Sequence, residues 1–219
     1  MGLPRLFRLS CAVLLLGAAS ACTQAARPAA APKPPVVRVA PLQIGEAPLV
    51  YEEVVHKGDR RYVGGTAYVL IDAPPEQVLA LLEPIEAYWH VLPRVWDVKD
   101  AGREGKDRLV ELEQGTQMVR GRYTVRVRTE RAEGNKYAIR FVLDDTRPHS
   151  ISDAYGSFGI EPYGPGRSLV TWKVRIDLGR GLIRWLFEDK VRKLSLVPPV
   201  LVRNYVDGHL ERARAELSD

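Results

Sequence analysis

The sequence predicts an α+β domain in which an antiparallel sheet of about seven strands packs against a long C-terminal helix. Three observations predict this fold. Apolar and polar residues alternate through most of the region from Trp96 to Ile176, which is the period of half-buried strands. Clusters of Gly, Asn and Pro interrupt this region at short intervals and predict tight turns. In about the last forty residues, the apolar side chains instead recur with the spacing of an amphipathic helix.

The N-terminal segment has the features of an export signal. Arg5 and Arg8 precede a short apolar run, and small residues then lead to Ala21. Because the run is too short to span a bilayer as a stable helix, we expect residues 1–21 to be a signal peptide.

The segment from Ala19 to Cys22 is similar to the lipobox of bacterial lipoproteins, in which the cysteine is acylated and becomes the new N-terminus. Ordinary signal-peptidase cleavage after Ala21 is the alternative. Cys11 leaves with the signal, so an unmodified Cys22 would be an unpaired thiol in an oxidising compartment. We therefore expect lipidation of Cys22 and a position on the bacterial envelope facing the periplasm. The outer membrane is favoured, and a soluble periplasmic or secreted form is the alternative.

Residues 22–49 are rich in Ala and Pro and lack the apolar periodicity of a packed element. This composition predicts a semi-rigid tether in partly extended polyproline geometry. A leader without a mechanical role would have the same composition. The folded domain is expected to cover residues 50–219.

The predicted domain opens with one strand and two short helices. Thr66–Ile71 is rich in β-branched and aromatic residues and predicts a strand, which the segment Asp72–Glu76 ends. Proline is tolerated in the first turn of a helix, and apolar spacing predicts a helix that runs to Pro84. A second short helix is expected over about Ile85–Val91.

After Pro93 the predicted strands have one apolar and one polar face. Residues 121–128 are the best example, because apolar and polar residues alternate and three of the polar residues are arginines. Similar segments follow at 137–143, 156–160 and 170–176. The arginine row could meet acidic lipid headgroups, but a solvated sheet face is the interpretation that we prefer.

The C-terminal region predicts one long amphipathic helix with an interruption. Apolar side chains from Leu182 to Leu194 share one face, with charged residues on the other. Pro198 and Pro199 must kink or split the helix, because proline removes a backbone hydrogen bond. The apolar spacing resumes at Leu201.

This order of elements, together with two motifs, resembles the START-like (SRPBCC) superfamily over roughly Tyr62 to Leu217. The first motif is Val69–Val78 (VLIDAPPEQV), and the second is the aromatic-rich segment Ile85–Pro93 (IEAYWHVLP). Members include polyketide cyclases, coenzyme Q-binding proteins, plant allergens and lipid-transfer domains. The resemblance implies a helix-grip fold, in which a curved sheet wraps around the C-terminal helix and leaves a cavity. The motifs mark this fold and no particular activity.

A curved sheet and a single helix cannot interdigitate fully, so the space between them either holds a ligand or is filled by large side chains. Seven aromatic residues are the candidates to bind a ligand there: Trp89, Tyr123, Phe141, Phe158, Trp172, Phe187 and Tyr205. An ordinary filled core is the alternative for each of them.

No set of catalytic or metal-binding residues stands out in the sequence. His90 could act as an acid or base, but we prefer that Trp89 packs under the sheet and His90 faces water. Asp144, Asp145 and His149 are too closely spaced to match a known metal site, so a solvated turn is preferred. The common nucleophile, phosphate-loop, zinc and dinucleotide motifs are absent from the sequence. We therefore expect neither a metal nor another cofactor, and the formal net charge of +5 gives no argument for nucleic acid.

We expect non-enzymatic binding or transport of a hydrophobic small molecule or lipid, from a lipid-anchored position at the envelope. The alternative is an enzyme of the polyketide cyclase or aromatase type that uses the same cavity. A third interpretation is an interaction domain whose cavity is filled. The enzyme comes second, because the sequence places no polar set clearly inside the fold. The oligomeric state and the identity of the ligand are not defined by the sequence.

Overall fold

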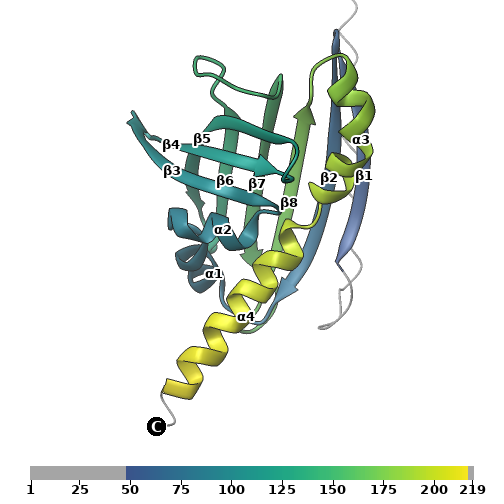
Figure 1. Ribbon diagram of the computed structural model, residues 1–219. Coiled ribbons are helices and arrows are strands. Elements are labelled where there is room, and N and C mark those ends of the chain that lie inside the picture. The colour runs from purple at the N-terminus through teal and green to yellow at the C-terminus, as the bar shows by residue number, and fades with distance from the viewer. Residues whose placement is uncertain (1–47, 217–219) are drawn as a thin grey trace, which may run out of the picture. The chain divides into compact units, whose positions relative to one another are not determined.

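Eight strands form one antiparallel sheet in the computed structural model, which describes residues 48–216 (Figure 1). Their order across the sheet is β1-β2-β8-β7-β6-β5-β4-β3. The strands are β1 (Leu49–Lys57), β2 (Arg60–Ile71), β3 (Val95–Glu104), β4 (Asp107–Gly115), β5 (Arg120–Ala132), β6 (Lys136–Leu143), β7 (Asp153–Pro162) and β8 (Ser168–Asp177). The helices are α1 (Pro75–Leu82), the short 3-10 helix η1 (Ile85–Ala87), α2 (Tyr88–Val91), α3 (Leu182–Leu194) and α4 (Pro198–Glu216).

The predicted α+β helix-grip class is confirmed, with one strand more than expected. The additional strand is β1, which pairs antiparallel with β2 at one edge of the sheet. The strand predicted at Thr66–Ile71 is the second half of the longer β2. The signal peptide, Cys22 and almost all of the expected tether lie outside the described residues and stay predictions, as do the expected domain bounds.

Two consecutive glycines let β2 pass close to both neighbouring strands. A Cβ atom on Gly64 would collide with the carbonyl oxygen of Val174 in β8, and one on Gly65 with the carbonyl oxygen of Tyr51 in β1. Glycine in a strand interior marks such close backbone approaches. These positions therefore permit the curvature of the sheet that Figure 1 shows.

The core forms where α1 and α4 cover the concave face of the sheet. Val78 and Leu82 of α1 and Val202 and Val206 of α4 are almost completely buried, in one cluster with inward-facing strand residues such as Val125. Proline at the first position of α1 and the apolar spacing behind it explain why this segment is helical. Burial of these side chains is the main source of stability of the fold.

On the opposite face of the sheet the predicted arginine row is neutralised by the protein itself. Arg122 is ion-paired with Glu113 at 2.9 Å, and Arg126 with Asp144 at 3.2 Å. Arg128 is paired in the same way with a β4 aspartate. The preferred interpretation, a polar sheet face, therefore agrees with the structure, and these arginines offer little free charge to a lipid headgroup.

The interruption at Pro198 divides the C-terminal region into two helices of different character. As expected, α3 ends at Leu194 and α4 begins at Pro198. The apolar face expected on α3 is not buried as predicted, because Leu182 is 68% and Leu186 is 48% exposed. Among the α3 side chains that the structure describes, none is buried. The reason is that α3 borders a cavity, so its spacing is helical but its apolar side chains have little protein to pack against.

Candidate ligand-binding cavity

A cavity of about 610 Å³ lies between the sheet and the junction of α3 with α4. Its walls are mainly apolar, and its size falls within the range of about 300–1,000 Å³ that small-molecule sites have. The wall residues include Leu112, Tyr123, Val125, Val127, Ile139, Phe141, Phe158, Trp172, Val174, Phe187, Val191, Leu194 and Pro198. The filled-core interpretation is therefore wrong for this part of the fold.

The mouth of the cavity can be located from the exposure of its wall residues. The exposed wall residues include Arg94, Val119 in the β4–β5 loop, Ser150 in the segment before β7, and Lys190 in α3. Buried wall residues such as Trp172 belong to the central strands. The cavity therefore opens between the β4–β5 loop and α3.

Three aromatic rings in contact form the floor of the cavity. Trp172 stacks on Phe141 with ring centroids 5.3 Å apart and lies 4.2 Å from Phe158. The indole N–H of Trp172 donates a 2.6 Å hydrogen bond to the carbonyl oxygen of Ser195, between α3 and α4. The floor thus joins three neighbouring strands to the junction of the two C-terminal helices.

Five of the seven predicted ligand-binding residues line this cavity, and two do not. Tyr123, Phe141, Phe158, Trp172 and Phe187 are wall residues. Trp89 is 45% exposed at the surface of α2, so the expectation that it packs under the sheet is wrong. Tyr205 stacks on His90 with centroids 5.1 Å apart, because α4 leaves the cavity after Pro198 and packs against α2. Ligand contact by the five wall residues stays a prediction.

One polar pair interrupts the apolar wall. The hydroxyl of Tyr123 donates to Oε1 of Gln114, and Nε2 of Gln114 donates to the carbonyl oxygen of Pro93 at 2.9 Å. Because a backbone carbonyl can only accept, the amide of Gln114 is fixed with its oxygen toward Tyr123. The lone pairs of the Tyr123 hydroxyl that remain can accept a hydrogen bond from a ligand.

Both tyrosines of the cavity wall stay neutral at physiological pH. Burial raises the pKa of Tyr123, and it raises the pKa of Tyr88 to about 12. Neither hydroxyl is therefore ionised as a ready base, and both act as neutral hydrogen-bonding groups.

The residues described along the cavity wall include no Asp, Glu, His or Cys. Within residues 48–216, no three such side chains are grouped so that they could hold a metal ion. The expected turn is present with Asp145 and His149 exposed, but Asp144 is buried rather than solvated. Although its burial opposes ionisation, hydrogen bonds from Thr146 and Arg126 hold the pKa of Asp144 below its usual value. Through these hydrogen bonds Asp144 links the β6–β7 loop to β5.

Sequence reasoning missed Gln114 and the cationic residues of the mouth. Gln114 follows Val110 and Leu112 on the inward face of β4, so a polar residue at an apolar position was the available signal. Arg94 and Lys190 carry no such signal, because charged residues beside a turn or on an amphipathic helix usually face solvent.

Solved structures with the same fold include proteins of different function. A STAR-related lipid transfer protein fragment from Xanthomonas axonopodis is 17% identical with a TM-score of 0.62, covering 76% of this chain and 97% of that chain. Human StAR-related lipid transfer protein 5 is 10% identical (TM-score 0.53; 72% and 87% covered). The Zhui aromatase/cyclase from Streptomyces is 15% identical (TM-score 0.51; 74% and 95% covered). At these identities the likeness shows the fold alone.

A search of curated proteins gave no match. Residues 63–196, from β2 to the start of the loop before α4, match the sequence profile of a family described as polyketide cyclase / dehydrase and lipid transport. This match covers most of the chain and includes nearly all the strands that form the cavity. The protein therefore belongs to the polyketide cyclase / dehydrase and lipid transport family, within the START-like (SRPBCC) superfamily.

Proposed function

We propose that the chain binds and carries a hydrophobic small molecule or lipid in this cavity without transforming it. The observation that supports this function best is a cavity of about 610 Å³ with apolar walls and with no described carboxylate or imidazole along them. General acid and base catalysis most often uses those groups. Burial of ligand surface would supply the affinity, at about 25 cal/mol per Å² of apolar area.

An enzyme of the aromatase or cyclase type is the second candidate. The Tyr123 and Gln114 pair inside the cavity and the likeness to the Zhui aromatase/cyclase fold favour it. It ranks below the carrier, because the neutral Tyr123 hydroxyl is already committed as a donor to Gln114.

Native mass spectrometry of gently purified protein tests the carrier function by detecting a small molecule that co-purifies. Val125→Trp places a large ring in the cavity wall, and Val142→Trp makes the same change on the exposed face of neighbouring β6. We expect the ligand with the wild type and Val142→Trp but not with Val125→Trp. A bare wild-type protein that also fails to take up added lipid would contradict the proposal.

We further propose that the domain works from a lipid-anchored position on the bacterial envelope. The N-terminal sequence pattern supports the anchor. Exposed apolar side chains on the β4–β5 loop and on α3, the two segments that border the mouth, support contact with a membrane: Met118, Leu182 and Trp185 are 96%, 68% and 79% exposed. Tryptophan is favoured at membrane interfaces. Among residues 48–216, no helix is both long enough and apolar enough to cross a bilayer.

Two experiments test the position at the membrane. Cells that express the full chain and grow with labelled palmitate should incorporate label, and Cys22→Ala should abolish it; an unlabelled wild type would disprove acylation. With the unanchored domain, Trp185→Ser should weaken flotation with vesicles of phosphatidylethanolamine and phosphatidylglycerol. Tyr155→Ser, on the opposite face of the sheet, is the control, because Tyr155 is also exposed. Equal flotation of both variants would remove α3 from the contact.

A further inference from the structure

The mouth of the cavity is cationic, and part of its charge is not neutralised by the protein. Four basic side chains border the cavity: Arg94, Arg120, Lys190 and Lys193. Arg120 is paired with Glu113 at 3.3 Å, and Lys193 with Asp189 at 3.0 Å. Arg94 and Lys190 have no ion-pair partner within the part of the chain that the structure describes. Two cationic groups are therefore available to a ligand at the opening of an apolar cavity.

The backbone at Arg94 is an independent sign that this side chain has a role. Its φ is +54°, in the left-handed region that glycine adopts far more readily than arginine. The other described non-glycine residue with positive φ is Asn135, which lies in the β5–β6 turn, where asparagine is common. Strain held at a ligand-facing position is a feature of functional sites.

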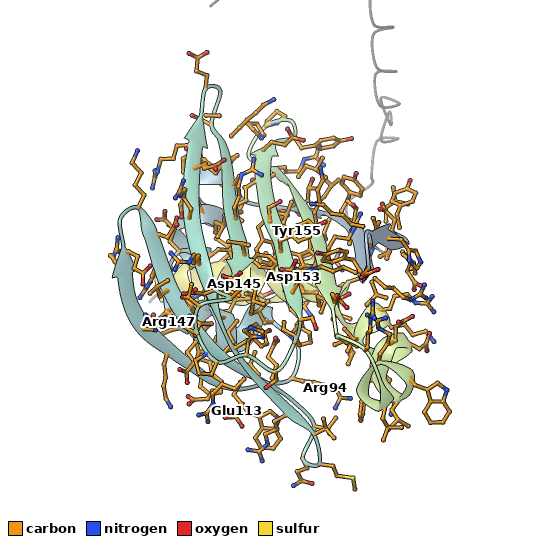
Figure 2. All side chains as sticks on the ribbon, turned by 90° about the horizontal axis from the view of Figure 1, so that it is seen from above. Arg94, Glu113, Asp145, Arg147, Asp153 and Tyr155 are labelled. Carbon is orange, nitrogen blue, oxygen red and sulfur yellow. The ribbon has the colours of Figure 1, made fainter. Side chains whose placement is uncertain are left out.

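The neighbouring structure keeps Arg94 at the mouth. The amide of Gly115, at the end of β4, donates a 3.0 Å hydrogen bond to the carbonyl oxygen of Arg94. In Figure 2, Arg94 is drawn between the β4–β5 hairpin and α3, the two segments that border the opening. A planar guanidinium at this point can bind two oxygens of a carboxylate or phosphate at once.

We propose that the preferred ligand is an anionic amphiphile, with its apolar part against the aromatic floor and its carboxylate or phosphate held by Arg94 and Lys190 at the mouth. The inference rests on the proposed carrier function and specifies its ligand class. Burial of the tail supplies most of the affinity, whereas the cationic pair selects acidic amphiphiles over neutral ones of the same length.

Titration calorimetry with three ligands of equal chain length tests the inference: dodecanoate, dodecyl phosphate and uncharged dodecanol. The wild type should bind the better of the two anions about tenfold more tightly than dodecanol, equivalent to about 1.4 kcal/mol. The variant Arg94→Gly with Lys190→Gln should lose this preference and keep its affinity for dodecanol. Comparison of the two anions distinguishes a carboxylate from a phosphate group.

The variants separate a loss of charge from a loss of folding. Glycine suits the φ of Arg94, so Arg94→Gly should not lower the unfolding temperature. Arg94→Lys keeps the charge and should retain most of the preference, and Lys173→Gln, exposed on the opposite face of β8, should leave it unchanged. Equal binding of all three ligands by the wild type would overturn the inference and leave the carrier function standing. Binding of none of them would contradict both.

Discussion

Replacing Trp172 by phenylalanine tests whether the floor of the cavity also holds the C-terminal helices in place. The indole is 4% exposed, and its N–H donates a 2.6 Å hydrogen bond to the carbonyl oxygen of Ser195. Phenylalanine keeps a ring near Phe158 but loses this donor and part of the buried ring. Loss of about 1 kcal/mol of hydrogen bonding and about 1–2 kcal/mol of apolar contact should lower the free energy of unfolding by about 2–3 kcal/mol.

Urea unfolding followed by circular dichroism measures this loss, and the unfolding temperature should fall by about 5–10 °C for a domain of this size. Trp96→Phe is the matched control. Trp96 also donates to a backbone carbonyl, that of Gly115 at 3.0 Å, but it is 40% exposed. Because water can replace an exposed hydrogen bond, its loss should cost less than about 1 kcal/mol. Equal losses of stability in the two variants would refute the reasoning.

Three further changes test other parts of the structure. Gly64→Ala should lower the free energy of unfolding by about 2 kcal/mol or more, because the added Cβ meets the backbone of β8; unchanged urea unfolding would contradict this. The hydrogen bond from Arg61 lowers the pKa of Glu188, so the attachment of α3 should be complete above the usual pKa of 4.5 and weaken as the pH falls through the lowered value. Hydrogen exchange of α3 should show this pH dependence in the wild type and not in Glu188→Gln. Tyr123→Phe leaves Oε1 of Gln114 without its donor and should cost about 1 kcal/mol in urea unfolding, with the cavity otherwise unchanged; wild-type stability would argue against the bond.

The central strands could be predicted from the sequence because one face of each is buried. Alternation at Val125 and Val127 therefore marked both the strand and its inward face. The edge strand β1 gave no such signal, since all of its residues are exposed or only partly buried. An edge strand of this kind is fixed by backbone pairing with β2, and pairing leaves no periodicity in the sequence.

The sequence predicted the cavity-lining residues of the strands better than those of the helices. Residues such as Phe141 and Trp172 line the cavity because the pleat sets the direction of each strand side chain. The direction of Trp89 or Tyr205 depends instead on how a helix is rotated against its neighbours, which only tertiary packing defines. The cationic residues of the mouth were missed for another reason. A sequence does not show which acidic side chains lie near Arg94, so the lack of an ion-pair partner is visible only in the structure.

The break at Pro198 separates two C-terminal helices that are held in the fold by different interactions. Beyond it, α4 buries Val202 and Val206 completely and belongs to the core. Before it, α3 is attached to the sheet mainly through ion pairs, which include Arg61–Glu188 with β2 at 2.8 Å and the more buried Arg184–Asp177 with β8 at 2.6 Å. A partly exposed pair such as Arg61–Glu188 contributes little compared with apolar burial, and none of the described α3 side chains is buried, so the core is stabilised by α4 far more than by α3. Because the paired prolines end one helix before the next begins, the packing of α4 in the core does not depend on a helix that continues along the cavity.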